Sequence, residues 1–204
     1  MYTRKEKIIM IVSAIVCIAS LLPWYFGKGT FNEETYERIC SNIVIGGTKV
    51  SMPFTLNDLG DDYYFDDTEE YKGFIYTKLM HNGKAAASVS AYVSGDDERE
   101  YPINSIIITD DPGYYGEKVE YDTDLINSIS ADGLRLGASE RTVRRKYGDP
   151  VDIDTEGCYE LCYYQYPEKY NGGIITVSYD FNEEKFPKRL QGIHIFYHID
   201  RPQG

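Results

Sequence analysis

The stretch "GIITVSYDF", residues 173–181, decides the fold because its side chains alternate between apolar and polar. In a strand, successive side chains point to opposite faces of the sheet. One face of this strand therefore receives the large apolar side chains, which are Ile175, Val177, Tyr179 and Phe181. The other face receives Thr176, Ser178 and Asp180. The pattern predicts an antiparallel sheet that buries one face in a core and leaves the other face open.

The stretch "GIHIFYH", residues 192–198, repeats this alternation near the end of the chain. Its core-facing set is Ile193, Ile195 and Tyr197. Its opposite set is His194, Phe196 and His198. We expect the second set to lie on the same polar and aromatic open face as Ser178.

Two short helices are predicted by their terminal residues. In "PFTLNDLG", residues 53–60, Thr55 can cap the start of a helix and Gly60 can end it. In "GLRLGASERTVRRKYGDP", residues 133–150, Ser139 takes the capping position. Val143 and Tyr147 lie four residues apart in this second helix, so both side chains would reach the core.

Hairpin signals accompany each helix, and their order predicts a duplicated unit. Turns are expected at Gly46-Gly47, at Asn82-Gly83 and at Asn171-Gly172. The run "INSIIIT", residues 103–109, supplies a closing strand in the first half, as residues 192–198 do in the second. We therefore expect an α+β fold class: an N-terminal transmembrane helix followed by two tandem units, each a short helix packed on an antiparallel β-sheet. The units would cover residues 41–112 and 113–204, and whether they share one sheet is left open.

Residues 8–26 carry no charge over 19 positions, which as a helix would span about 28 Å at roughly 1.5 Å per residue. The basic residues before them predict a cytoplasmic stub, residues 1–7, a single-pass signal anchor and an extracytoplasmic body in the cell membrane. Residues 27–40 would form a tether. Cleavage after Ala19 and lipidation at Cys17 are the alternatives.

The formal net charge of −12 is concentrated after the anchor, because residues 1–7 are net basic. An acidic surface repels phosphate backbones, so nucleic acid is excluded as a partner. A protein, a cationic polymer or a metal ion is compatible with this charge.

The body contains an odd number of cysteines, namely Cys40, Cys158 and Cys162. If residues 158–162 are extended, their two sulfur-bearing side chains lie about 13 Å apart, which is beyond disulfide reach. We interpret the cysteines as reduced and partly buried. A bend, or a bridge to Cys40, is the alternative.

The stretch "LGASERTVRRKYGDP", followed by "YELCYYQY" and "GGIITVSYDF", resembles the small outer-membrane assembly lipoproteins. The doubled unit is similar to the tandem arrangement of the β-lactamase inhibitor protein fold and to anchored or secreted proteins of Gram-positive bacteria. The resemblance implies a fold that binds other proteins through its sheet face and loops rather than one that catalyses a reaction. Two features depart from the family pattern. Cys162-Tyr163-Tyr164 stands where the family commonly has Trp, and the helix expected after Ser139 ends in the basic residues Arg144, Arg145 and Lys146.

Catalytic and metal motifs are incomplete in this chain. "DIDTEG", residues 152–157, begins like a calcium loop, but its twelfth position is Tyr163 rather than a bidentate acid. On a strand, His194 and His198 lie about 13 Å apart, too far to share a zinc ion. No nucleophile elbow, zinc-binding helix or phosphate-binding glycine loop occurs in the sequence. We expect no catalytic residue, no cofactor and no metal ligand.

The expected function is that of a membrane-tethered extracytoplasmic binding module for a protein or a cell-envelope component. Tyrosine, with 20 copies, suits both strands and contact surfaces. The candidate binding residues are Tyr164, Tyr166, Thr176, Ser178, His194, Phe196, Arg144 and Arg145. Structurally, the two arginines would simply complement the helix dipole. The alternatives are an inhibitor of a secreted enzyme, and an envelope enzyme or metal-dependent sensor.

Overall fold

A computed structural model describes five segments of the chain: residues 29–111, 119–155, 159–165, 175–182 and 188–197. The expected membrane segment, residues 8–26, lies outside these segments, as do Tyr166, Cys158, His198 and the expected boundary between residues 112 and 113. Among the helices of the described segments, none is both long and apolar enough to cross a membrane.

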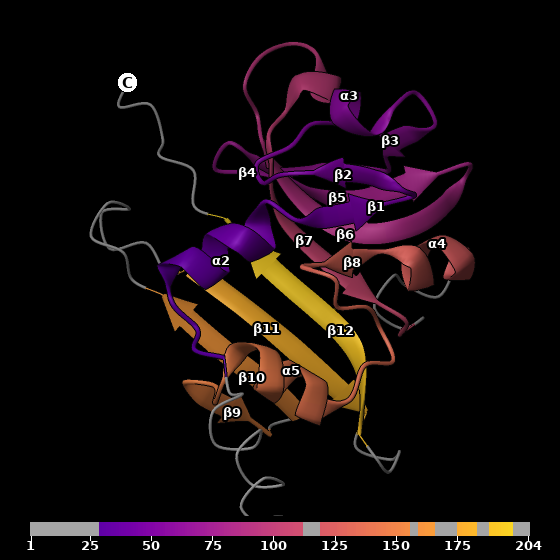
Figure 1. The fold of residues 1–204 in the computed structure, drawn as a ribbon. Helices are drawn as coiled ribbons and strands as arrows, with labels where there is room; N and C mark the ends of the chain where they lie inside the picture. The colour runs from indigo at the N-terminus through magenta and orange to yellow at the C-terminus, as the bar shows by residue number, and fades with distance from the viewer. Residues whose placement is uncertain (1–28, 112–118, 156–158, 166–174, 183–187, 198–204) are drawn as a thin grey trace, which may run out of the picture.

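A nine-stranded antiparallel sheet dominates the structure (Figure 1). Its strand order is β3-β5-β6-β7-β12-β11-β10-β9, and β4 pairs with β5. The strands from the first half of the chain are β3 (Tyr63–Phe65), β4 (Glu69–Tyr71), β5 (Phe74–His81), β6 (Lys84–Tyr92) and β7 (Ile103–Thr109). Those from the second half are β9 (Asp152–Asp154), β10 (Tyr159–Gln165), β11 (Ile175–Asn182) and β12 (Arg189–Phe196).

A second layer covers one face of this large sheet. It contains a small sheet of order β2-β1-β8, formed by β1 (Ile43–Ile45), β2 (Thr48–Val50) and β8 (Ser130–Ala131). It also contains the helices α2 (Glu33–Cys40), α3 (Leu56–Leu59), α4 (Thr123–Ser128) and α5 (Glu140–Tyr147). The loop between β6 and β7 holds a short 3₁₀-helix, η1 (Glu98–Glu100). In Figure 1, α2 and α5 lie over β10–β12, and the small sheet lies over β5–β7.

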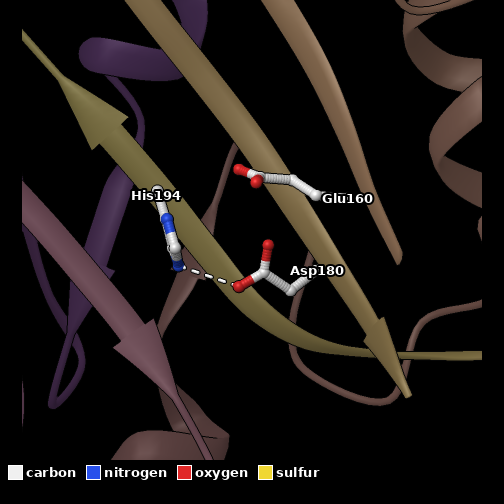
Figure 2. Close-up of side chains that lie close together, drawn as sticks. All are labelled: Glu160, Asp180 and His194. Atoms are coloured by element: carbon white, nitrogen blue, oxygen red, sulfur yellow. Dashed lines mark ion pairs between the residues drawn. The ribbon is translucent and has the colours of Figure 1, made fainter. Parts of the chain in front are cut away.

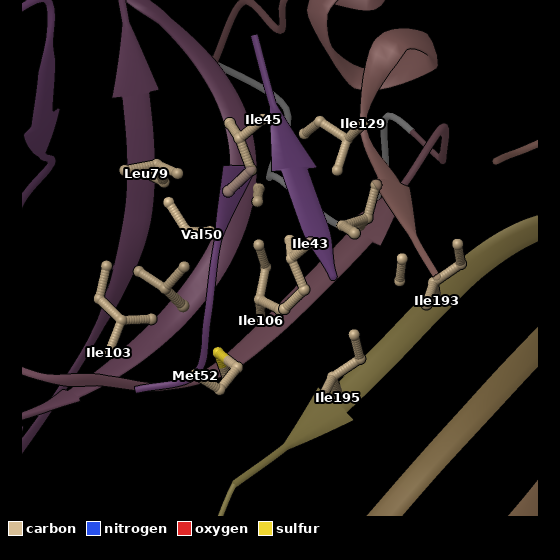
Figure 3. Packing of buried hydrophobic residues seen from close by; sticks show 14 of the residues in the cluster. Ile43, Ile45, Val50, Met52, Leu79, Ile103, Ile106, Ile129, Ile193 and Ile195 are labelled. Atoms are coloured by element: carbon tan, nitrogen blue, oxygen red, sulfur yellow. The ribbon is translucent and has the colours of Figure 1, made fainter. Parts of the chain in front are cut away.

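One continuous core fills the space between the two layers. Ile43 and Ile45 of the small sheet are fully buried, and Ile43 lies beside Ile106 of the large sheet (Figure 3). Under α5, the ring of Tyr147 stacks on that of Tyr179 with centroids 5.6 Å apart. The expectation that Val143 and Tyr147 reach the core is confirmed, because both are 0% exposed.

The α+β fold class with two helix-on-sheet units is wrong. The described residues form a mostly antiparallel β structure, and strands from both halves share one sheet. The two halves join where β7 pairs with β12, with Ile193 opposite Ile108 and Ile195 opposite Ile106. In a separate unit each of these strands would present an edge of unpaired backbone groups, and their pairing removes both edges.

The first half also lacks a helix large enough to cover its strands. Helix α3 has only 4 residues. The small sheet covers β5–β7 instead, and its strand β8 comes from the second half of the chain. Because the cover of one half contains a strand of the other, the halves do not form independent units.

The predicted turns at Gly46-Gly47 and Asn82-Gly83 and the predicted Ser139 cap are confirmed, whereas the expected turn at Asn171-Gly172 lies outside the described residues. Gly46 and Gly47 connect β1 to β2, and Asn82 and Gly83 connect β5 to β6, all four with positive φ. The hydroxyl of Ser139 accepts a hydrogen bond from the backbone of Thr142 at the start of α5. These elements depend on short-range chemistry, which a sequence specifies directly.

Residues 33–40 of the expected tether form helix α2. Asn32 caps this helix by accepting a hydrogen bond from the backbone of Thr35 at 2.8 Å. Tyr36 and Ile39 are fully buried in the core. This segment is therefore part of the folded body.

Candidate functional site

The face of the large sheet opposite the helices and the small sheet is called the open face here. No helix of the described segments lies on it. The alternation predicted for β12 is confirmed: Ile193 and Ile195 are buried in the core, whereas Phe196, on the opposite side, is 39% exposed. The open face thus carries the side chains that the core does not use.

One row of cross-strand partners crosses the centre of the open face. Tyr76 on β5 pairs with Ser90, Ser90 pairs with Ser105, and Ser105 pairs with Phe196. The two small serines leave a shallow hollow of about 320 Å³. The hollow is lined by Tyr76, Thr77, Ser88, Val89, Ser90, Ser105, Ile107 and Phe196. Exposed aromatic rings therefore flank a floor of small side chains.

A carboxylate–histidine cluster occupies the other half of the open face, on three adjacent strands (Figure 2). Glu160 on β10 pairs directly with Asp180 on β11. The Nε2 atom of His194 on β12 lies 2.9 Å from Oδ2 of Asp180. One ligand atom from each of the three residues lies within 4.8 Å of the others.

Gly192 allows this geometry. It lies opposite Asp180 in the register, and a Cβ atom at Gly192 would come within 2.6 Å of Asp180 Oδ2. Because glycine has no side chain, the Asp180 carboxylate can lie over the β12 backbone and reach His194. A β-bulge follows between Asp180 and Phe181, and such irregularities often occur beside functional sites.

Negative charge predominates in this cluster, which has two carboxylates and one histidine. Glu160 and Asp180 are like charges directly opposite each other, an arrangement that destabilises a sheet. Asp180 Oδ1 is buried and has no hydrogen-bond partner among the described residues. Asp154 pairs with Glu160 on its other side, so the row of acids extends to the sheet edge. This part of the face attracts cations.

The structure brings some of the predicted binding residues together. Ser178 pairs with His194 and is buried at 2% exposure. Thr176 on β11 pairs with Tyr164 on β10, so their backbones are adjacent. Tyr166 lies outside the described residues.

The structure places Arg144 and Arg145 elsewhere. Both belong to α5, which covers the opposite face of the large sheet. Arg144 Nε donates to Glu140 at 2.7 Å, and Arg144 Nη2 donates to the hydroxyl of Tyr159 at 3.2 Å. These contacts fit the structural role that helix-end cations usually have.

The neighbouring cation Lys146 also has a structural contact. Its Nζ lies 3.1 Å from Oδ2 of Asp132. The same oxygen accepts hydrogen bonds from the Tyr147 hydroxyl at 3.1 Å and from Arg38 Nε at 3.2 Å. Asp132 therefore links α2 to α5 on the covered face.

Cys40 and Cys162 are both buried, and no disulfide joins these two. Burial raises the pKa of the Cys40 thiol to about 12. The segment that begins like a calcium loop contributes Asp152–Asp154 as strand β9 at the sheet edge. These three residues, whose spacing resembles the start of a calcium loop, therefore form an extended strand in the structure.

The sequence analysis missed Glu160 as a site residue and placed Asp180 on the polar face without assigning it a role. The available signal was the alternation of β11 and β12, which put Asp180 and His194 on one face. The sequence does not show the register between the strands, and only this cross-strand pairing brings residues 160, 180 and 194 together.

The fold and site define a class: an antiparallel β protein with one covered sheet face and one open face that carries aromatic, serine, carboxylate and histidine side chains. No protein-family model, curated protein or solved structure significantly matches this chain. The resemblance to assembly lipoproteins and to the β-lactamase inhibitor protein fold stays a prediction.

Proposed function

We propose that this protein is an extracytoplasmic binding module, held at the cell membrane by residues 8–26, which binds a protein or a cell-envelope component through its open face. It acts by binding rather than by catalysis. The observation that carries the proposal is the pair of exposed aromatic side chains beside the hollow. Tyr76 is 53% exposed and Phe196 is 39% exposed.

Aromatic side chains on a rigid sheet suit recognition for two reasons. They bury a large area on contact and lose little conformational entropy, since each has only two side-chain torsions. At the base of the hollow, the hydroxyl of Ser105 is placed for a hydrogen bond to a ligand, whereas the buried hydroxyl of Ser90 donates to Asn104 Oδ1. Both rings lie in one cross-strand row, so a single ligand segment can contact both.

The sheet also keeps this surface preorganised. The floor of the hollow comes from the central strands β6 and β7, which have paired neighbours on both sides. Sites built on strands hold their geometry better than sites built on loops. A partner would therefore bind without having to order the surface first.

A photocrosslinking experiment in intact cells tests the partner role. A photoreactive amino acid at Ser88, which lines the hollow, should give a discrete crosslinked product with the full-length chain. The Tyr76→Ser/Phe196→Ser double variant should lose that product. Val151→Ser is the matched control, because Val151 is 69% exposed but does not line the hollow. Equal crosslinking in the double variant and the control would refute binding through the open face.

Membrane attachment needs a separate measurement. The full chain should sediment with membranes and resist extraction by carbonate, and its body should be digested by a protease added outside the cytoplasm. A chain that is fully released by carbonate, or that is protected from external protease, contradicts the proposed location.

A further inference from the structure

We propose that Glu160, Asp180 and His194 form a binding site for one divalent transition-metal ion, with Zn²⁺ as the best fit. This inference goes beyond the proposed partner binding. Metal binding can be measured without a partner, so either proposal can fail while the other stands.

The geometry brings one donor from each of three neighbouring strands to a common point. The separation of His194 Nε2 and Asp180 Oδ2 is 2.9 Å. Two ligand atoms each about 2.1 Å from one ion lie about 3.0 Å apart at a right angle and about 3.4 Å apart at the tetrahedral angle. The histidine and aspartate atoms are therefore already spaced as two ligands of one ion.

Glu160 completes the set with a short adjustment. All three donor atoms lie within 4.8 Å of one another, and the Glu160 carboxylate in Figure 2 lies above that of Asp180 on the same side of the sheet. Rotation about the side-chain torsions of glutamate can move its carboxylate toward the ion while the backbone pairing of β10 and β11 is kept.

The donor types select the class of ion. An imidazole nitrogen favours Zn²⁺ and its first-row neighbours, whereas Mg²⁺ and Ca²⁺ prefer sites made entirely of oxygen. Two carboxylates balance the charge of a divalent cation. Three protein ligands leave at least one coordination position for water or for a group from a bound partner.

Two further observations point to a cation here. Asp180 Oδ1 is buried and lacks a hydrogen-bond partner among the described residues, and in Figure 2 the Asp180 oxygen not bonded to His194 points toward Glu160. An ion at this point would contact that oxygen or its neighbour and would remove the repulsion between the two opposed carboxylates. Gly192 contributes by leaving room for the carboxylate, as a Cβ atom there would clash with it.

The experiment uses the full chain purified in detergent and stripped of metal with a chelator. Calorimetric titration with ZnCl₂ should show one equivalent of Zn²⁺ bound per chain, and an excess of Mg²⁺ should not displace it. Even removal of an outer-shell partner typically weakens metal binding about 10- to 100-fold, so His194→Ala and Asp180→Asn should weaken it by about 100-fold or more. Glu160→Gln should weaken it by at least about 10-fold.

His81→Ala is the matched control. His81 Nδ1 also lies close to a carboxylate, 3.2 Å from Asp122 Oδ2, but that pair is not among the three-residue groups that could hold an ion in the described chain. This variant should bind Zn²⁺ as the wild type does. Gly192→Ala should weaken binding without removing a ligand, because it displaces the Asp180 carboxylate.

Circular dichroism of each metal-free variant establishes that it is folded. If His194→Ala does not fold, Glu160→Gln still tests the site, since it keeps the shape of the side chain. The proposal is overturned if the stripped wild type binds no Zn²⁺. It is also overturned if all ligand variants bind Zn²⁺ as tightly as His81→Ala, which would show adventitious binding only.

Discussion

The carboxylate of Asp132 is expected to contribute substantially to stability, and its replacement by asparagine measures that contribution. The side chain is 7% exposed. It accepts hydrogen bonds from the Tyr147 hydroxyl and from Arg38 Nε, and it forms an ion pair with Lys146. Asp132 has φ 48°, a left-handed conformation that asparagine adopts readily. Asp132→Asn therefore removes the charge while keeping the backbone and the size of the side chain.

The expected loss follows from the exposure of the three partners. A hydrogen bond between a buried hydroxyl and a carboxylate contributes about 1.5–3 kcal/mol, and asparagine keeps part of this through its amide oxygen. Lys146 and Arg38 are 33% and 43% exposed, so solvent screening limits each ion pair to about 0–1 kcal/mol. We expect Asp132→Asn to reduce the free energy of unfolding by about 2 kcal/mol.

Thermal unfolding followed by circular dichroism measures this effect. A loss of about 2 kcal/mol corresponds to a decrease in Tm of roughly 4–8 °C for a chain of this size. Arg145→Gln is the control, because Arg145 is exposed on the same helix. The Asp132→Asn/Tyr147→Phe double variant should lose less than the sum of the single variants, since both act on the same hydrogen bond, which the first weakens and the second removes. A Tm for Asp132→Asn that equals that of the control, or full additivity with Tyr147→Phe, would refute the reasoning.

Three further predictions concern the core and the turns. Because burial raises the pKa of Cys40 from 9.0 to about 12, the folded state holds this proton more tightly than the unfolded state. Stability should therefore decrease above pH 9 by up to about 1.4 kcal/mol per pH unit, and Cys40→Ala should lessen that slope in denaturation curves. Gly46→Ala should lower Tm more than Gly47→Ala. Both glycines have positive φ, but only at Gly46 would a Cβ atom meet the Tyr63 hydroxyl, and equal Tm values would contradict this. Ile193→Ala should cost about 2–5 kcal/mol, because Ile193 is fully buried. It should still unfold in one urea transition, whereas two transitions would show that the halves are uncoupled.

The sequence predicted the local elements of this fold well because their causes lie within a few residues. Ser139 and Thr142 form the cap of α5, and Asn82 with Gly83 forms the β5–β6 turn. The alternation of β12 correctly separated Ile193 from His194. Each of these features is set by conformational preference or by a side-chain period that a single sequence displays.

The assembly of these elements was not predictable in the same way. The pairing of β7 with β12 joins residues 83 to 91 positions apart, and no local pattern specifies it. From their sequences, β7 and β12 were each predicted to be the last strand of a separate sheet. The decisive factor is that paired strands leave fewer exposed edges than two separate sheets would.

The two parts of the open face differ in how they depend on this assembly. The aromatic row requires the central junction, since Tyr76, Ser90 and Ser105 come from the first half and Phe196 from the second. The carboxylate–histidine cluster lies entirely on β10, β11 and β12. A substitution that loosens the junction from the β7 side, such as Ile106→Ala, should therefore disturb contacts across the aromatic row, while the strands that carry Glu160, Asp180 and His194 are left unchanged. Zn²⁺ binding and partner crosslinking measured on that one variant would separate the two parts of the face.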